Sequence, residues 1–163
     1  MWRFEFVSHK YADDKVLYAI IDLKNMVWHY PLRSHKQWID KNLRPEDYHL
    51  LLWHDSELAG YLNLVQLKGT TDAWGIGNVV VNPDKQGQNV GYLLMNLCDF
   101  FLVQTKTPGM LICKDSVLVF YEKCGWHEFS GNVRCQSEDI TNHFLTRHFD
   151  NSHYSNIEID RVF

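Results

Sequence analysis

A short polar loop with two glycines, set between an apolar strand and an apolar helix, is the segment of this chain best suited to chemistry. It lies in "VVVNPDKQGQNVGYLLM", residues 79–95, where Gly87 and Gly91 flank Gln88 and Asn89. A helix that starts directly after a tight turn leaves its first amides unpaired and the positive end of its dipole exposed, so it attracts anions. The glycines let a ligand approach the backbone, and the amide side chains add no repelling charge. A diphosphate would fit such a loop.

Local reasoning leaves a second explanation of this loop open. Gly87 could serve only to relieve strain in the turn, and Gly91 only to let the helix pack closely on the sheet. The two common phosphate fingerprints are absent, because the loop lacks the lysine and hydroxyl of a Walker motif and the glycine spacing of G-x-G-x-x-G. A second motif elsewhere in the chain is needed to decide between the two.

That second motif lies downstream. The stretch "VFYEKCGWHEF" sets in order Phe120, Tyr121, Lys123, Gly125 and Trp126. Together with Gln86 and Gly91 it resembles the GNAT superfamily, the Gcn5-related N-acetyltransferases, whose motif A reads Q/R-x-x-G-x-G/A after a strand and whose motif B ends in F-Y-x-K-x-G-F. The resemblance covers residues 48–129, and "LYAIIDLKNMVWHYP" with the loop also resembles ElaA-like members. Asn89 replaces the middle glycine of motif A, and asparagine tolerates a left-handed backbone.

By this resemblance the ligand is acetyl-CoA. Backbone groups of Val79 and Val81 would pair with its pantetheine arm like an added strand, in a gap between the strand that ends at Val81 and the strand "MLICKDS". The Val81 amide would also stabilise the oxygen of the tetrahedral intermediate. The loop amides would hold the pyrophosphate, so the implied coenzyme-binding residues are Val79, Val81, Gln86, Gly87, Gln88, Asn89, Val90, Gly91 and Tyr92.

The resemblance also implies a catalytic role for Tyr121, which matches the family tyrosine that protonates the departing thiolate. Phenols, whose pKa is about 10, keep their proton at neutral pH yet can give it to a basic thiolate. The helix pattern alone would instead make Tyr121 a core aromatic. At the position of the family's glutamate base this chain has Gly75, so the strand offers space for an acceptor and no base. Candidates for the base elsewhere are Asp72, His29, Glu57 and His153, or a chain of waters.

The function we expect is an N-acetyltransferase that moves an acetyl group directly from acetyl-CoA to a primary amine of a small molecule or protein. A catalytically silent module that binds or senses acyl-CoA is the alternative, because Gly75 replaces a base and Asn89 replaces a glycine. The stretches "WHYPLRSHKQW" and "RHFDNSHY" are rich in aromatic residues and histidine. They would line either an acceptor pocket or a homodimer contact.

The elements that position these residues are expected to form one α/β (α+β) domain over residues 1–163, with a mixed, mostly antiparallel sheet flanked by helices, as in the GNAT fold. Apolar residues at helical spacing predict helices over about 13–28, ended by Pro31, and from Val90 to Phe101. Further helices are expected over 34–41, capped by Ser34, and over 117–124, stopping at Gly125. Strands are expected in "MWRFEFVSHK", on both sides of 54–56, up to Val81, and in "MLICKDS", "WHEFSG" and "IEIDRVF".

Composition excludes several classes of protein. With 45% hydrophobic and 22% charged residues the chain is typical of globular proteins, and a net charge of -4 offers no basic field for nucleic acid. No run of apolar residues is long enough to cross a membrane, and the start of the sequence lacks the features of a signal peptide. We therefore expect a cytoplasmic protein with reduced cysteines. Cys124, His127 and Cys135 lack the paired spacing of a zinc site, so no metal is expected.

Overall fold

The computed structural model describes all residues, 1–163, and divides them between two compact units. The first unit comprises Met1–Val65 and Asn78–Cys98, and the second comprises Gln66–Gly77 and Asp99–Phe163. Three elements contribute residues to both: β3 (Glu57–Leu67), β4 (Ala73–Val81) and α3 (Val90–Thr105). That residues 1–163 make a single domain stays a prediction, and each unit is described in turn.

An antiparallel meander forms the sheet of the first unit. β1 (Trp2–Ser8) pairs with β2 (Tyr48–His54), and β2 pairs with β3, so β1 lies at the edge. The predicted hairpin is confirmed: His54 faces Glu57 across the turn, and Asp55 takes a left-handed φ of 54°. Asparagine and aspartate adopt this conformation more readily than other side chains, which is why the polar triplet makes the turn.

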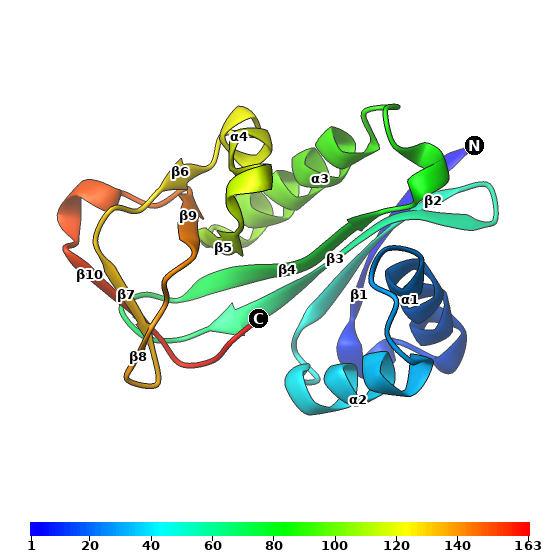
Figure 1. Cartoon of the computed structure of the whole chain (residues 1–163), viewed down its shortest axis with the longest axis horizontal. Helices are drawn as coiled ribbons and strands as arrows, with labels where there is room; N and C mark the ends of the chain where they lie inside the picture. Colours follow the sequence, from blue (N-terminus) through cyan, green and yellow to red (C-terminus); the bar gives the residue numbers. More distant parts are fainter. The chain divides into compact units, whose positions relative to one another are not determined.

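Two helices lie side by side next to these strands (Figure 1). α1 (Asp14–Val27) begins where the Asp13 carboxylate accepts a hydrogen bond from the Val16 amide at 2.9 Å, as expected for an N-cap. α2 (Leu32–Asn42) was expected to start at Ser34, and this is wrong. Its N-cap is Pro31, and the Ser34 amide already donates to the Pro31 carbonyl at 2.8 Å, inside the first turn. Pro31 therefore starts α2 rather than ending α1.

Polar side chains are buried beneath these helices in the first unit. The fully buried His49 contacts the Tyr61 hydroxyl through Nδ1 at 2.6 Å and the His9 ring through Nε2 at 2.9 Å. Burial, with the charges of His9 and Lys24, lowers the pKa of His49 to about 3. Lys24 is buried over the ring of Trp38, 4.7 Å from its centre, and burial lowers its pKa to about 8. The interior therefore keeps His49 neutral.

The second unit combines a mixed set of strands with a small separate sheet. The first half of β4 pairs in parallel with β5 (Gly109–Cys113), and β9 (His143–Arg147) pairs antiparallel with both β5 and β6 (His127–Glu128). α4 (Asp115–Lys123) follows β5, as predicted, and ends before Gly125 with its left-handed φ of 89°. Across the chain, the predicted mixed and mostly antiparallel pairing is confirmed.

The small sheet contains strands that the sequence analysis did not predict. Its order is β10–β7–β8, with β7 at Asn132–Cys135 and β8 at Glu138–Asp139. β10 (Asn156–Ile159) pairs in parallel with β7, so the strand expected in "IEIDRVF" is present but ends at Ile159. The strand expected in "WHEFSG" is likewise present but has only two residues.

Two further findings concern the chain as a whole. All four cysteines are free thiols, of which Cys98, Cys113 and Cys135 are buried. None of the helices combines the length and the apolar character that a membrane crossing requires.

Candidate functional site

The loop between β4 and α3 is tied to the first unit at its start. Asn82 is buried, and its amide donates to the Ala59 carbonyl at 2.8 Å, which fixes the end of β4 against β3. The Asn82 side chain accepts from the Asp84 amide at 2.9 Å and so caps a turn of 3-10 helix, Pro83–Lys85. The next residues, 86–89, are exposed. A fixed base thus presents a short exposed stretch of backbone.

Two residues of this exposed stretch take a left-handed backbone. Gly87 has φ 79° and Asn89 has φ 61°, which agrees with the expectation that asparagine can stand where motif A has glycine. A Cβ atom at Gly87 would meet nothing within 4 Å, so it is the conformation and not crowding that favours glycine there. The Asn89 carbonyl accepts from the Leu93 amide at 3.0 Å, which begins α3.

The first turn of α3 combines a buried anchor with open amides. Val90 and Leu94 are buried, and both lie 3.6 Å from the position that a Cβ of Gly60 would take, so α3 packs on β3 at Gly60. The first amides of a helix have no carbonyl one turn earlier to bond with. The first turn of α3 contains no acidic residue. An anion would meet backbone N–H groups and the positive end of the helix dipole here, without a repelling carboxylate.

The backbone of β4 departs from extended geometry at one residue before the loop. Asn78 has a φ of 52° within the strand, and its Nδ2 donates to Oδ1 of the buried Asn63 at 2.5 Å. Beyond it, Val79 and Val81 are half-buried and alternate with the buried Val80. The two valines that match the family's pantetheine positions therefore lie on one face of the strand, in the same unit as the loop.

Gly75 does not offer the free space that the sequence suggested, and this expectation is corrected. In the second unit the ring of Phe163 lies 2.6 Å from the position that a Cβ of Gly75 would take. The absence of a side chain makes room for Phe163 instead of for an acceptor. No carboxylate replaces the family's base at this position of β4.

The other candidates for the base lie apart from one another. In the first unit, His29 is exposed and Glu57 lies 3.9 Å from the Lys85 ammonium group. In the second unit, exposed Asp72 and His153 pair with Lys68 at 3.2 Å and with Asp150 at 3.5 Å, respectively. Three of the four are already paired with an oppositely charged or ionisable side chain at the surface, and none lies on β4, so the structure favours none of them over a water chain.

Tyr121 lies on α4 in the second unit, half-buried, with its ring centre 5.1 Å from that of Phe120. Side chains from β9 hold this helix at both ends. His143 bonds to the carboxylate of Asp115 in the first turn, and Arg147 Nη1 donates to the Gly125 carbonyl at 2.7 Å just after the last turn. Hydrogen bonds to Glu128 and Asp115 raise the pKa of His143. The helix that carries Tyr121 is thus fixed to a strand.

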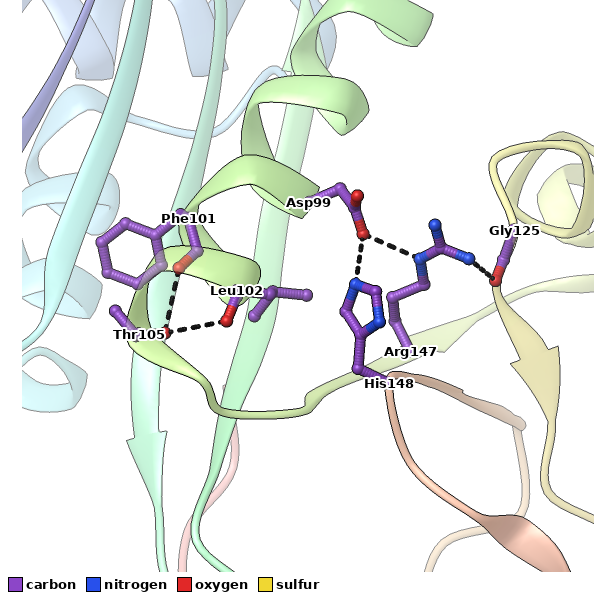
Figure 2. A network of polar contacts seen from close by, with 7 residues as sticks. All are labelled: Asp99, Phe101, Leu102, Thr105, Gly125, Arg147 and His148. Carbon is purple, nitrogen blue, oxygen red and sulfur yellow. Dashed lines mark hydrogen bonds and ion pairs between the residues drawn. The ribbon is translucent and has the colours of Figure 1, made fainter.

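A half-buried carboxylate completes the contact at the end of α4 (Figure 2). Asp99 on α3 accepts from Arg147 Nε at 2.8 Å and contacts His148 Nε2 at 2.7 Å. Partial burial acts to raise the pKa of Asp99, but the hydrogen bonds and charges of Arg147 and His148 outweigh it and lower the pKa. Sequence reasoning missed Asp99 and Arg147; the only local signal was the glycine of motif B, whose carbonyl Arg147 binds.

The side chains that commonly bind metal ions are not grouped in this structure. No group of three or more histidine, cysteine, aspartate or glutamate residues lies close enough to hold a metal ion. Cys124, His127 and Cys135, which were considered as ligands from the sequence, do not form such a group.

Comparison with known proteins gives consistent results. A model of the acetyltransferase (GNAT) family matches residues 17–126. Among solved structures, Escherichia coli ElaA is 22% identical with a TM-score of 0.68, covering 90% of this chain and 99% of that one. An acyl-CoA N-acyltransferase from Pseudomonas aeruginosa is 22% identical with a TM-score of 0.70 and the same coverage. An aminoglycoside 6′-N-acetyltransferase complexed with coenzyme A is 15% identical with a TM-score of 0.67, covering 88% and 96%. No curated protein matches the chain at a significant level.

Proposed function

Because this chain belongs to the GNAT family of acetyltransferases, we propose that it transfers an acetyl group from acetyl-CoA directly to a primary amine of a small molecule or a protein. The observation that carries the proposal is the loop before α3. Its exposed residues 86–89, two left-handed positions and open helix amides make a cradle without negative charge, which fits a diphosphate. The solved aminoglycoside acetyltransferase with coenzyme A has the same fold and supports the choice of ligand.

In this proposal the coenzyme-binding groups all belong to the first unit. The Gln86 amide already donates to the Pro83 carbonyl at 3.3 Å, so we assign the pyrophosphate to the amides from Gly87 to Gly91. The backbone of Val79 and Val81 pairs with the pantetheine arm. Acetyl-CoA supplies the activated acyl group. Since these contacts use backbone atoms, they tolerate the departures of this chain from the family motif, including Asn89.

The chemical step needs one proton donor and one proton acceptor. As the amine nitrogen bonds to the acetyl carbon and the carbon–sulfur bond breaks, the Tyr121 hydroxyl gives its proton to the departing sulfur. The Val81 amide stabilises the oxyanion. The proton lost by the amine passes to water, because β4 carries no carboxylate at Gly75. Tyr121 is assigned this role by its register in motif B, and α4 is held firmly enough to keep a side chain in place.

Release of the coenzyme A thiol over a panel of amines tests the proposal. Polyamines, amino acids, aminoglycosides and lysine peptides are each offered with acetyl-CoA, and at least one is expected to accelerate thiol release. Gln88→Glu, which adds a carboxylate to the exposed loop, is expected to weaken acetyl-CoA binding about tenfold by repelling the phosphates. The matched control is Gln37→Glu on the exposed face of α2, which should leave binding unchanged. Equal binding by both variants would remove the loop from the site.

A second candidate function is a silent module that binds acyl-CoA without turnover. The ring of Phe163 beside Gly75 favours it, because that position of β4 then offers neither a base nor open space. Acetyl-CoA would raise the melting temperature of such a module as it does for an enzyme, but no amine would release the thiol. Turnover with any amine of the panel excludes this candidate.

A further inference from the structure

The outer edge of β1 carries backbone groups that point away from the sheet. On the inner side, the Met1 carbonyl accepts from the Asp55 amide at 2.9 Å, and the His9 amide donates to the Asp47 carbonyl at 2.7 Å. Backbone N–H and C=O groups of successive strand residues point to opposite sides, so odd-numbered residues face β2. The N–H and C=O groups of even-numbered residues, Trp2 and Phe4 among them, therefore face outward.

Apart from the charges of Arg3 and Glu5, this edge lacks the features that usually prevent strands from pairing between molecules. β1 contains no proline, glycine or lysine, and its pairing with β2 runs through seven residues without a bulge. Its apolar side chains are exposed: Trp2 at 42% and Phe4 at 48%. A regular, apolar edge strand of this length is a template for another strand.

The two faces of β1 differ in character. Trp2 and Phe4 project on one face, while Arg3 and Glu5 project on the other, beside Trp53. The Arg3 guanidinium lies 5.2 Å from the centre of the Trp53 ring, and Trp53 Nε1 donates to Glu5 at 2.9 Å. These contacts hold the two opposite charges side by side, 3.6 Å apart, close to the free edge.

We propose that β1 pairs antiparallel with β1 of a second copy of this chain, about a two-fold axis at Phe4. In this register Phe4 faces Phe4 of the second copy, and Trp2 faces Phe6. Arg3 faces Glu5 of the second copy, and Glu5 faces Arg3, so two opposite-charge pairs flank the axis. The interface is self-complementary, as a two-fold dimer requires.

The charges select this register over its neighbours. Since the outward groups belong to even-numbered residues, the strands can slip only in ways that keep even residues opposite even residues. One slip places Arg3 against Arg3, and the opposite slip places Glu5 against Glu5. Both put like charges at pairs without hydrogen bonds, where Cα atoms approach to about 4.5 Å and repulsion is strongest. The next larger slips leave Arg3 without a strand residue opposite, because it would face Met1 or His9, both outside β1.

A charge exchange tests the pairing. Sedimentation velocity over a range of concentrations is expected to show a monomer–dimer equilibrium for the wild-type chain. Arg3→Glu and Glu5→Arg each place like charges opposite one another and are expected to weaken the dimer about tenfold or more. The double variant, with both charges exchanged, restores the opposite pairs and is expected to recover dimerisation. Arg33→Glu on α2 and Glu138→Arg on β8, both at exposed positions outside β1, change the net charge equally and should leave the dimer intact.

Each outcome of these measurements either supports or overturns the proposed pairing of β1. A monomeric wild-type chain at all concentrations overturns the proposal and leaves the edge to a strand of a different protein. A dimer that ignores the single variants, or a folded double variant that stays monomeric, places the contact elsewhere. Melting temperatures of all variants separate loss of pairing from loss of folding, which matters because Glu5 also binds Trp53.

Disulfide formation between single cysteines, one introduced in each copy, tests the register directly. At Phe4→Cys the two sulfur-bearing residues face one another with Cα atoms about 5.5 Å apart, within the range for a disulfide. At Arg3→Cys or Phe6→Cys the same residues of the two copies are about 8 Å or more apart, beyond that range. We expect an oxidised dimer at position 4 and none at 3 or 6, with the wild-type chain as the control for its own cysteines. Cross-linking that is faster at position 3 or 6 than at position 4 overturns this register.

Discussion

A single hydroxyl group separates Tyr121 from phenylalanine, and the proposed acid role rests on that group. Tyr121→Phe keeps the ring and its contact with Phe120 but removes the proton donor. We expect kcat to fall by about a hundredfold or more, as is common for loss of a general acid, while the dissociation constant for acetyl-CoA changes less than about twofold. Steady-state kinetics with the best amine of the panel and calorimetric titration measure the two quantities.

The control for this variant is Tyr18→Phe, because Tyr18 is an exposed tyrosine on α1. It should change neither quantity. Equal losses in turnover and in acetyl-CoA binding at Tyr121→Phe would assign the hydroxyl to binding rather than to proton transfer.

Individual site residues could be predicted from the sequence only where the backbone itself signals them. Gly87 and Asn89 adopt left-handed angles that few other residues take, so the loop before α3 was visible as a special turn. That the Phe163 ring occupies the space beside Gly75 could not be predicted, because 88 positions separate the two residues and nothing local specifies the contact. A glycine marks a missing side chain but does not say what occupies the space.

Arg147 links three elements, and we expect its replacement to loosen α4. It binds Asp99 on α3 through Nε and the Gly125 carbonyl after α4 through Nη1. Lysine keeps the charge but lacks the fork of donors, so Arg147→Lys should lower the free energy of unfolding by about 1–3 kcal/mol and leave Asp99 poorly paired. Denaturant unfolding measures this change. Hydrogen exchange should rise in α4 before the rest of the second unit.

Arg134→Lys is the matched control for that variant. Arg134 also pairs with a carboxylate, Asp139 at 3.1 Å, but on the surface, where ion pairs contribute roughly 0–1 kcal/mol. The same loss of stability at both positions would mean that the contact with α4 is no more important than a surface pair.

Elements with strong periodicity were predictable, and those that depend on distant partners were not. α1, α3 and the β2–β3 hairpin follow from apolar spacing and turn residues. β7 and β10 are only four residues each, and their parallel pairing joins segments more than twenty positions apart. The misplaced start of α2 has a local cause: the fixed φ of Pro31 suits the residue before a helix, so the helix begins at Leu32 and Ser34 falls inside its first turn.

For the molecule as a whole, the buried His49 makes the free energy of unfolding depend on pH. Its pKa is about 3 when folded, mainly because of burial, against an ordinary value of 6.5. Between pH 6.5 and 3 the unfolded chain binds a proton at this residue that the folded chain refuses, so stability falls as the pH falls. We expect His49 to contribute up to about 1.4 kcal/mol per pH unit to this slope.

His49→Gln removes that proton while an amide can still bond to the Tyr61 hydroxyl. The free energy of unfolding, measured at several pH values between 3 and 7, should therefore depend less steeply on pH in this variant. His29→Gln, at an exposed histidine, should leave the slope of the wild-type chain unchanged. An unchanged slope in His49→Gln would show that the acid sensitivity arises at other residues.

The environment of the cysteines allows free coenzyme A to be measured with a thiol-reactive dye in the presence of this protein. Burial raises the pKa of Cys113 to about 11, and it raises the pKa of Cys124 and Cys135 as well. Since the thiolate is the form that attacks disulfide dyes, these side chains should react slowly at neutral pH. Colour that develops quickly in a reaction mixture then reports free coenzyme A, and the folded protein contributes only a slow, constant background.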